Sequence, residues 1–587
     1  MLRIIKILSL IAFGALAASA YTFTDVEGRQ FEGSVIAVDR GDVSIRRGSD
    51  GSVFRVSKAR FCQADQVYFE QWSGDISERS APMTYRLAEG ETIRALPRQL
   101  RIDLIWERSE FKDYEVQRSR TAEGEWETLR NPTSIFHLYS DYIGQPGERF
   151  FYRVRGVKLH RNGSIAAHSD WSQVVEGTTL PFEVNSFVEE VQEAGVRFFF
   201  ERAHPDSGLS PEGDPGWGDI CAVGSTGMGM TNIVVGVHRG FVSRAEGRDL
   251  ALKMLRFLDT KAERHGGAFG HWMDGASGRI RNFGKNYNAV DLVETSFLIQ
   301  GIILLREYFD ADSPEECELR VIATRLSDAV QWDKFMVTQK RGPIMMWHWH
   351  PLDGFGDLTI HGFHEAMMPY ILGIGSDTHP ITPESFYTGW IHPVYGLGRP
   401  RTDFGIEHTL GRGIGWPLFF AHYSHIGFDP RQLVYLGKTY FEHFVDATRV
   451  HGAYAKSRAD EFKGYDTLWG LAASVTPEGY QSNRPGRSDG GTIATTAALS
   501  SMPYLPEAVL KCMESMYLDY GKELWGAFGF YNAINPSRDW VAQKYIGIEL
   551  GPIAPMIENH RSGLLWKLFM QAPEVKRAQQ RIAAFQP

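Results

Sequence analysis

Three carboxylate side chains in apolar surroundings are the strongest candidates for chemistry in this sequence. Asp291 and Glu294 stand three residues apart on one face of a predicted helix that is otherwise apolar as far as Phe309. Glu365 lies among aromatic and apolar residues, where burial can raise the pKa of a carboxyl enough for it to act as a general acid. Hydrolysis of a glycosidic bond needs one carboxylic acid and a second carboxylate. These three residues would supply both.

A purely structural interpretation of the same acids stays open. Asp291 and Glu294 fit the first turn of a helix capped by Asn288, where the helix dipole favours acidic side chains. Glu365 could likewise sit in a first turn or pair with an arginine.

Aromatic and histidine residues gather around Glu365. Nine of the nineteen histidines lie between His348 and His425, beside Trp347, Trp349, Trp390 and Trp416. Aromatic faces with polar groups around them are typical of a carbohydrate cleft, although such residues also fill the ends of large helical cores. The histidine pairs could bind a metal in principle. Because the sequence has neither a CxxC pair nor an HExxH helix, we predict no metal and no cofactor.

The elements that must position these residues belong to a long helical segment, residues 183–587. Apolar residues recur at helical spacing in Phe187–Arg202, Val290–Phe309 and Glu365–Leu372. Twelve helices over this segment would leave roughly 34 residues for each helix and its loop, which suits six helix pairs in an α/α toroid. No repeat of solenoid period is present.

Two smaller segments of strand period precede the helical one. Residues 21–78 alternate apolar and polar positions between glycine-rich turns, and residues 82–180 continue with spaced strands typical of a β-sandwich. The first resembles the SLA1 homology domain, an SH3-like module, and the second resembles a fibronectin type III domain. These resemblances imply a role in holding a partner or a neighbouring domain.

The N-terminus and the composition predict an exported protein. Residues 1–20 combine Arg3 and Lys6 with a short apolar run and a small-residue end, which is typical of a signal peptide cleaved before Tyr21. A short membrane anchor is the weaker alternative, since the run is under the ~18 residues of a span. We expect a periplasmic or extracellular protein without a membrane span. The net charge of -9, without basic blocks, argues against nucleic acid as a partner. The four cysteines are far apart and predict buried free thiols.

Eight ordered blocks of residues 183–587, including VDLVETSFLIQGIILLREYF, GFHEAMMPYILGIGSDTHPI and YIGIELGPIAPMIENHRSGLLWKLFM, resemble the glucoamylase-like domain of glycoside hydrolase family 144. The resemblance implies an (α/α)6 toroid and an inverting hydrolase of β-1,2-glucan that needs no metal. It places the family's acids on Asp291, Glu294 and Glu365. It places the sugar-binding pocket at Trp347, Trp349, His379 and Trp390.

The mechanism that follows gives each acid a role. Glu365 would protonate the leaving oxygen, while the side formed by Asp291 and Glu294 would position the sugar or activate water. Inversion requires acid and base about 6.5 to 9.5 Å apart. Two other functions stay open: hydrolysis or transglycosylation of another glucan, and glycan binding at a surface without cleavage. The sequence leaves endo or exo action and the oligomeric state undetermined.

Overall fold

The computed structural model describes residues 21–38, 42–47, 53–63, 65–66, 85, 87–88, 90–111, 113–130, 137–283, 289–391, 400–409 and 413–585. The predicted signal peptide, residues 1–20, lies outside the described residues. The chain divides into two compact units, Met1–Ser80 and Ala81–Pro587.

The first unit is an antiparallel meander around a small aromatic core. Its strands follow one another in the sheet in chain order: β1 (Tyr21–Thr24), β2 (Gln30–Val38), β3 (Asp42–Arg47) and β4 (Val53–Ser57). Phe23, Val43, Ile45 and Phe61 are buried together on one side of this sheet. The alternation of these apolar residues with polar ones produces the two faces.

The second unit begins with two antiparallel sheets that pack face to face. One sheet has the order β5-β6-β9, and the other has the order β11-β10-β7-β8 with β12 paired to β10. Their bounds are β5 (Ile93–Arg98), β6 (Arg101–Trp106), β7 (Asp113–Ser119), β8 (Glu127–Arg130), β9 (Leu138–Tyr142), β10 (Arg149–Leu159), β11 (Ile165–His168) and β12 (Val175–Thr178). Ile102, Leu104 and Trp106 of β6 meet Val116 and Tyr152 of the other sheet in a shared core.

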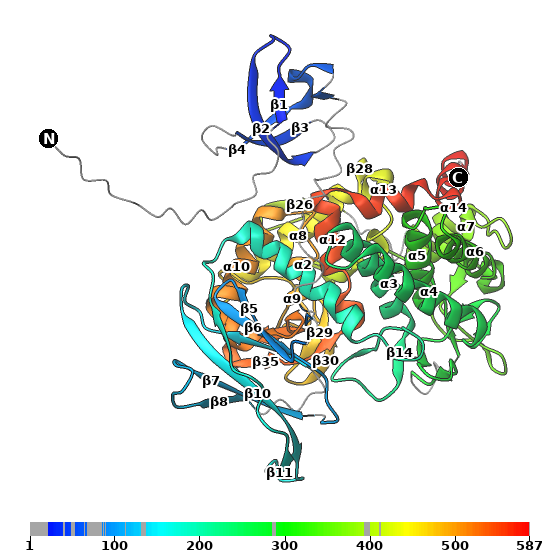
Figure 1. The fold of residues 1–587 in the computed structure, drawn as a ribbon. Helices are drawn as coiled ribbons and strands as arrows, with labels where there is room; N and C mark the ends of the chain where they lie inside the picture. Colours follow the sequence, from blue (N-terminus) through cyan, green and yellow to red (C-terminus); the bar gives the residue numbers. More distant parts are fainter. Residues whose placement is uncertain are drawn as a thin grey trace. The chain divides into compact units, whose positions relative to one another are not determined.

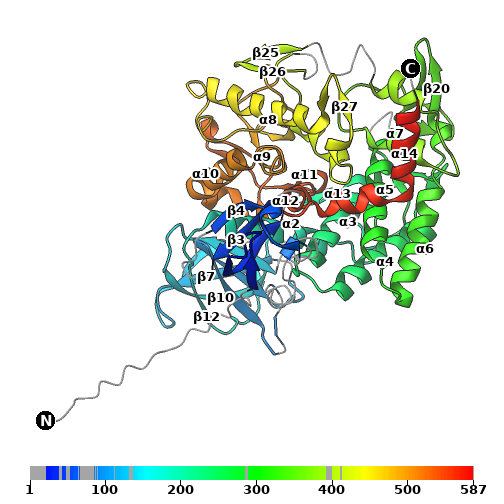
Figure 2. The same ribbon diagram turned by 90° about the horizontal axis from the view of Figure 1, so that it is seen from above.

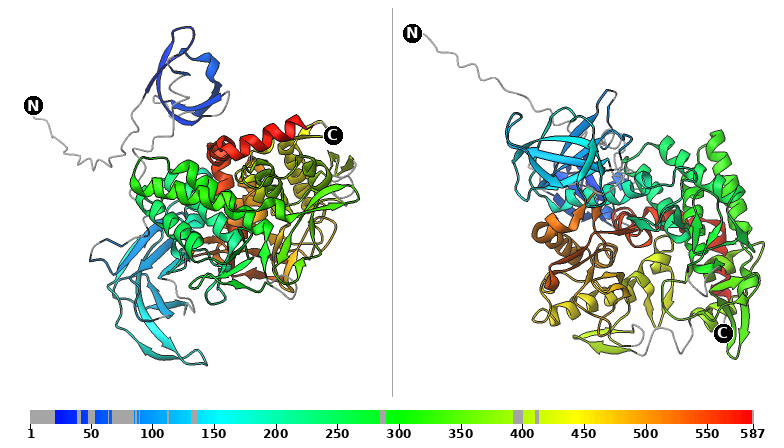
Figure 3. Two further views of the ribbon diagram at one scale, coloured as in Figure 1. Left: turned by 90° about the vertical axis from the view of Figure 1, so that its right-hand side faces the viewer. Right: turned by 90° about the horizontal axis from the view of Figure 1, so that it is seen from below.

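The opposite face of β6 is buried against the helical part. Arg101 is 1% exposed and donates to Glu190 at 2.6 Å and to the Tyr517 hydroxyl at 3.0 Å. The same guanidinium bonds to Asp103 at 3.1 Å and lies 4.4 Å from the ring centre of Trp525. Figure 3 shows the sandwich strands at one flank of the helices. This buried ionic contact joins the sandwich and the helices into one unit.

Thirteen helices are described in the second unit. They are α2 (Val184–Glu201), α3 (Val223–His238), α4 (Arg244–Thr260), α5 (Leu292–Tyr308), α6 (Pro314–Asp328), α7 (Met368–Gly375), α8 (Tyr440–Ser457), α9 (Thr495–Leu499), α10 (Pro506–Leu524), α11 (Gly547–Leu550), α12 (Ile553–Arg561), α13 (Leu564–Gln571) and α14 (Pro573–Ala584). Figure 2 shows α3 to α6 on one side of this part and α8 to α10 on the other.

Helices α3 and α5 pack closely against each other. Both are buried nearly all round, which explains why their sequences are apolar on every face. Gly227 allows their close approach, because a Cβ at this position would meet the backbone of Phe297.

A succession of contacts links the buried helices. α12 packs against α3, α3 against α5, α5 against α7, and α9 against α12. The short 3-10 helices η5 (Leu418–Ala421) and η6 (Tyr423–His425) fill the interval between α7 and α9. Met368 of α7 donates its backbone N–H to Ser424 at 3.2 Å, and His422 bonds to Ser501 just beyond α9 at 3.0 Å. Each of these elements therefore has a buried neighbour on both sides.

Short strands precede several of the buried helices and form small sheets at one end of them (Figure 1). β14 (Ile220–Ala222) leads into α3, β19 (Val290–Asp291) into α5, β31 (Ile493–Ala494) into α9 and β36 (Tyr545–Ile546) into α11. Their partners include β13 (Gly213–Asp214), β17 (Trp272–Asp274), β18 (Ile280–Arg281), β22 (His348–His350), β23 (Gly354–Phe355), β34 (Ala533–Asn535) and β35 (Trp540–Ala542).

Further short strands complete this part of the chain: β15 (Arg264–His265), β16 (Ala268–Phe269), β20 (Met336–Gln339), β21 (Gly342–Met346), β24 (Thr359–Ile360), β25 (Arg401–Asp403), β26 (Ile406–His408), β27 (Val434–Tyr435), β28 (Lys438–Thr439), β29 (Ala473–Thr476), β30 (Gly479–Ser482), β32 (Trp525–Gly526) and β33 (Gly529–Phe530).

The predicted helices at 187–202 and 290–309 correspond to α2 and α5. The helix predicted from Glu365 begins at Met368 instead, with Pro369 in its first turn. Glu365 lies in the bend before it. All four cysteines are free, as predicted, but only Cys221 and Cys512 are buried.

Candidate active site

Asp291 is the last residue of strand β19 and the N-cap of helix α5. Its Oδ1 atom accepts from the backbone N–H groups of Val293 and Glu294, each at 3.0 Å. The alternative prediction of an Asn288 cap is therefore wrong. Because Val290 and Asp291 are held extended by pairing with β22, the helix begins only at Leu292.

The second oxygen of Asp291 is held by two histidines. His271 contacts Oδ2 through Nδ1 at 3.0 Å, and His348 contacts it through Nε2 at 3.2 Å. The pairing of β19 with β22 sets His348 directly opposite Asp291. Burial alone would raise the pKa of Asp291, but hydrogen bonds from His271 and His348 outweigh it and hold the pKa well below its usual range. Asp291 is thus an ionised group whose two oxygens both have partners.

Glu294 lies one helical turn further along α5 and is 6% exposed. Its Oε2 atom accepts from the backbone N–H of Gly224, at the start of α3, at 2.6 Å. Burial raises the pKa of Glu294, the positive charge of His271 lowers it, and the charge of Asp291 raises it again, to about 7. A carboxyl with this pKa can exchange a proton near neutral pH.

His271 lies between these two acids and was not among the predicted residues. Its Nδ1 atom is 3.9 Å from Glu294 Oε1, and Phe283 stacks on its ring with centroids 3.6 Å apart. Burial would lower the pKa of His271, but the charge of Glu294 and the hydrogen bond to Asp291 raise it to about 9. The imidazole therefore carries a proton and a positive charge at neutral pH.

Glu549 is a further acid that the sequence did not single out. It lies in α11, is 1% exposed, and accepts from the Tyr480 hydroxyl at 2.7 Å and from the Asn532 amide. Burial raises the pKa of Glu549 to about 7, although the bonds from Tyr480 and Asn532 lower it. Its sequence signal was a single acid in the apolar block YIGIELGP.

Glu212 completes this side of the site. Strand β13 pairs with β36, and the backbone N–H of Gly547 donates to the Glu212 carbonyl at 2.8 Å. The charge of Glu212 contributes to the raised pKa of both Glu294 and Glu549. The place of Glu212 in the site depends on the pairing of β13 with β36, which the local sequence does not indicate.

Glu365 lies in the bend that precedes α7. Its Oε2 atom is 3.5 Å from His364 Nδ1, and that nitrogen accepts from the backbone N–H of Ala366 at 3.1 Å. Since Nδ1 presents a lone pair to Ala366, it has no proton for Glu365 in this tautomer. The backbone carbonyl of Glu365 accepts from Ser424, which ties the bend to η6.

Tyr423 is the common neighbour of the acids. It is buried, and the pKa of its hydroxyl is raised well above the usual range, first by burial and then by nearby negative charges. Those charges belong to Glu549, Glu365, Glu294 and Glu212. Asp291 and Glu294 therefore lie together on either side of His271, and both Glu294 and Glu365 act on the Tyr423 hydroxyl.

Two of the predicted sugar-binding residues lie beside Glu365. Trp347 stacks on His364, with centroids 5.7 Å apart and an interplanar angle of 25°. Trp390 meets the same histidine edge-on at 5.4 Å but is only 1% exposed. Trp390 thus supports His364 from the core and offers no open face.

The other two have different surroundings. Trp349 is on the opposite face of β22 from His348, and Lys334 lies 3.8 Å from its ring centre. His379 follows α7, and its Nδ1 atom is 3.2 Å from Asp333. These contacts place neither residue against the acids.

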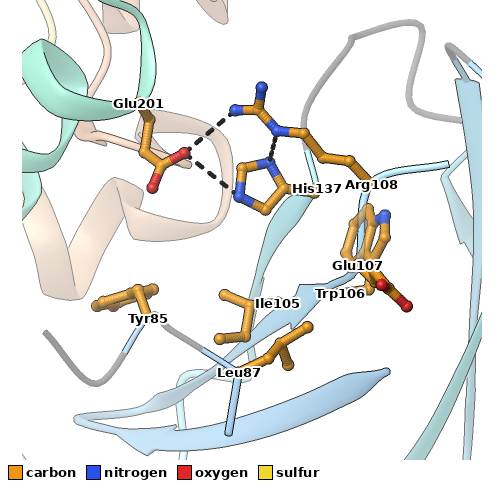
Figure 4. A pocket seen from close by; sticks show the side chains of 8 residues that line it. All are labelled: Tyr85, Leu87, Ile105, Trp106, Glu107, Arg108, His137 and Glu201. Atoms are coloured by element: carbon orange, nitrogen blue, oxygen red, sulfur yellow. Dashed lines mark hydrogen bonds and ion pairs between the residues drawn. The ribbon is translucent and has the colours of Figure 1, made fainter. Parts of the chain in front are cut away.

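A cavity of about 370 Å³ lies between the sandwich and the end of α2. Figure 4 shows Arg108 and His137 turned toward Glu201, with nitrogen atoms 3.3 Å from the same oxygen. Both nitrogen donors thus contact the same carboxylate oxygen of Glu201.

Within the described part of the chain, no group of three or more His, Cys, Asp or Glu side chains is arranged to hold a metal ion. In the same described residues, no helix has the length and apolar character of a membrane span.

Known proteins resemble this chain in sequence and in structure. The Glycoamylase family model, which describes glucoamylases, matches residues 357–573. The exo β-1,2-glucooligosaccharide sophorohydrolase (non-reducing end) of Parabacteroides distasonis is 34% identical over 508 residues, or 82% of this chain and 69% of the relative. The chain belongs to the same family as this sophorohydrolase.

Two solved structures of the family resemble the chain over different lengths. A β-1,2-glucanase from Parabacteroides distasonis matches with a TM-score of 0.79 and 32% identity, over 92% of this chain and 78% of its own. The endo-β-1,2-glucanase from Chitinophaga pinensis, in complex with sophorotriose and glucose, matches with a TM-score of 0.65 and 34% identity. That match covers 68% of this chain and 98% of the Chitinophaga chain.

Proposed function

We propose that this protein is a glycoside hydrolase that cleaves β-1,2-glucan by an inverting acid–base mechanism. The observation that carries the proposal is the buried group at the start of α5, where His271 Nδ1 lies 3.0 Å from Asp291 and 3.9 Å from Glu294, in a chain of the sophorohydrolase family. General acid–base catalysis at neutral pH is most efficient when the pKa of the catalytic carboxyl group lies near neutrality. Glu294 has the raised pKa that this requires.

The two acids of α5 have different tasks. Asp291 is a poor base because its oxygens are bonded on both sides and its pKa is low. It positions His271 and the first turn of α5. Glu294, with a pKa of about 7, takes the proton from the water that attacks the anomeric carbon.

Glu365 provides the acid. It donates its proton to the glycosidic oxygen as the bond to the anomeric carbon breaks, and the leaving sugar departs with a free hydroxyl. Trp347 and Trp390 pack against His364, and Ser424 donates a hydrogen bond to the backbone carbonyl of Glu365. These contacts restrict the position of the Glu365 carboxyl group. Water enters from the opposite face of the sugar, so the product has the inverted configuration.

We further propose that the buried helices form an (α/α)6 toroid of the kind found in glycoside hydrolase family 144. The continuous contacts from α3 through α5, α7, η6, α9 and α12 back to α3 support it. The four-stranded meander of the first unit supports an SH3-like module, and the two packed sheets of residues 82–180 support a fibronectin type III-like module. Residues 1–20 support export to the periplasm or beyond.

Release of the disaccharide sophorose from chain ends is the favoured mode of action. The exo-acting relative aligns with 82% of this chain, whereas the endo-acting structure covers 68%. The relative whose similarity to this chain extends beyond the helical part is therefore an exo-acting enzyme.

Product analysis tests the function directly. The full-length protein is incubated with linear β-1,2-glucan and with other α- and β-glucans, and the products are sized while the first-formed anomer is followed by NMR. Sophorose formed only from the β-1,2 polymer, with inverted configuration, is the expected result. A polymer that is retarded but left intact supports glycan binding without cleavage, and cleavage of another glucan replaces the proposed substrate.

A further inference from the structure

An exposed aromatic surface that includes Trp217, Phe283 and Tyr480 lies beside the acid cluster and has no part in the mechanism above. Five large aromatic side chains are exposed among the residues that the structure describes: Trp217, Phe283, Phe355, Phe404 and Tyr480. Tyr480 bonds to Glu549, and Phe283 stacks on His271. Trp217, which is 52% exposed, continues the aromatic surface outward from Phe283.

The rings form a connected series. Phe283 meets Trp272 at right angles with centroids 4.9 Å apart, and Trp272 meets Trp217 at 5.3 Å. Trp272 lies in β17, which pairs with β14 directly before α3 and with β18. Trp217 directly precedes the two-residue turn that leads into β14. The same short strands that precede the buried helices therefore hold this aromatic surface in place.

Lys544 connects the surface with the other side of the site. Its ammonium group is 4.9 Å from the ring centre of Trp217, and its charge also lowers the pKa of Glu549. A cation over an indole ring fixes the position of the ring. Trp217 is thus held next to the acids from two directions, through Trp272 and through Lys544.

We propose that Trp217 is a specificity-determining residue that stacks on a glucosyl ring of the substrate outside the bond that is cleaved. This inference rests on the proposed function. Sugar rings expose C–H groups on their faces, which pack well against an exposed indole. Since Trp272 lies between Trp217 and His271, the stacked sugar is not the one whose anomeric carbon reacts. Trp217 therefore favours longer chains over the shortest cleavable oligomer.

The test compares Trp217→Ala and Trp217→Phe with the wild-type protein on β-1,2-linked glucose oligomers of increasing length. Trp126→Ala is the matched control, because Trp126 lies on the sandwich against Arg153. We expect Trp217→Ala to raise KM about tenfold for long oligomers, the size of one lost aromatic contact. The kcat for the shortest oligomer should be unchanged, Trp217→Phe should restore part of the affinity, and the control should match the wild type.

Equal KM values for Trp217→Ala and the wild type at every length would overturn the inference while leaving the proposed function intact. An equal loss of kcat/KM in Trp217→Ala for oligomers of every length would also overturn the inference, since that pattern indicates a disturbed Phe283–His271 stack. A wild-type protein that neither binds nor cleaves any glucan of the panel would overturn the proposed function together with this inference.

Discussion

Replacing His271 by glutamine should move the acidic limb of the pH–activity profile toward higher pH. Glutamine keeps an N–H donor for Asp291 but removes the positive charge that lies 3.9 Å from Glu294. That charge lowers the pKa of Glu294, so its loss raises the pKa above the present value of about 7. Glu294 must be ionised to accept a proton from water. As the pH is lowered, the activity of His271→Gln will therefore begin to fall at a higher pH than the activity of the wild type.

The size of the effect follows from Coulomb's law. Two unit charges 3.9 Å apart interact by ~4 kcal/mol at an effective dielectric constant of ~20, which corresponds to ~3 pKa units. Water that fills the space of the smaller side chain will screen part of this interaction. We expect the acidic limb to move by at least about one pH unit.

The assay is the pH dependence of kcat/KM on a β-1,2-glucose oligomer, which reports the groups of the free enzyme. His265→Gln is the control, since His265 lies near Trp349 and pairs with Glu263 rather than with the acids. An acidic limb that stays in place, or moves to lower pH, in His271→Gln would refute the assignment of Glu294 as the base.

Three further predictions concern other buried polar groups. Tyr480→Phe removes a hydrogen bond that lowers the pKa of Glu549, so NMR titration of that carboxyl should give a pKa above about 7; an unchanged value would exclude this bond. Arg101→Met removes the buried guanidinium that pairs with Asp103 and Glu190 and should lower the free energy of unfolding by about 3–5 kcal/mol, and an unchanged denaturation midpoint would contradict the buried network. Burial lowers the pKa of His422 from 6.5 to about 3. As the pH falls below 6.5, this histidine binds a proton in the unfolded chain but not in the folded one, so the free energy of unfolding decreases. His422→Gln should therefore lose less stability between pH 7 and pH 5 than the wild type, and equal losses would rule the prediction out.

The local sequence predicts that Asp291 and Glu294 lie at the start of a helix, because this placement depends on local structure. An acid at the start of an apolar helix is either a cap or a functional group, and Asp291 caps the helix while it also contacts His271. The start of the helix was predicted less well. Pairing with β22, a strand almost sixty residues later, keeps Val290 extended and moves the cap from Asn288 to Asp291.

Other residues of the site depend on contacts that no local pattern contains. Glu212 reaches the cluster only because β13 pairs with β36, more than three hundred residues away. His271 becomes a charged group only because two acids of another element surround it. Among the predicted sugar contacts, Trp349 lies on the opposite face of β22 from His348, a consequence of the alternation of side chains along a strand.

The measurement that tests the central claim most directly is the turnover of Glu365→Gln on linear β-1,2-glucan. If Glu365 donates the proton to the leaving oxygen, kcat should fall by about 10²–10⁴, the usual contribution of a general acid. The thermal unfolding temperature should stay unchanged, because Glu365 lies in a bend and its backbone contact with Ser424 remains. Near-normal turnover in a folded Glu365→Gln protein would contradict the account.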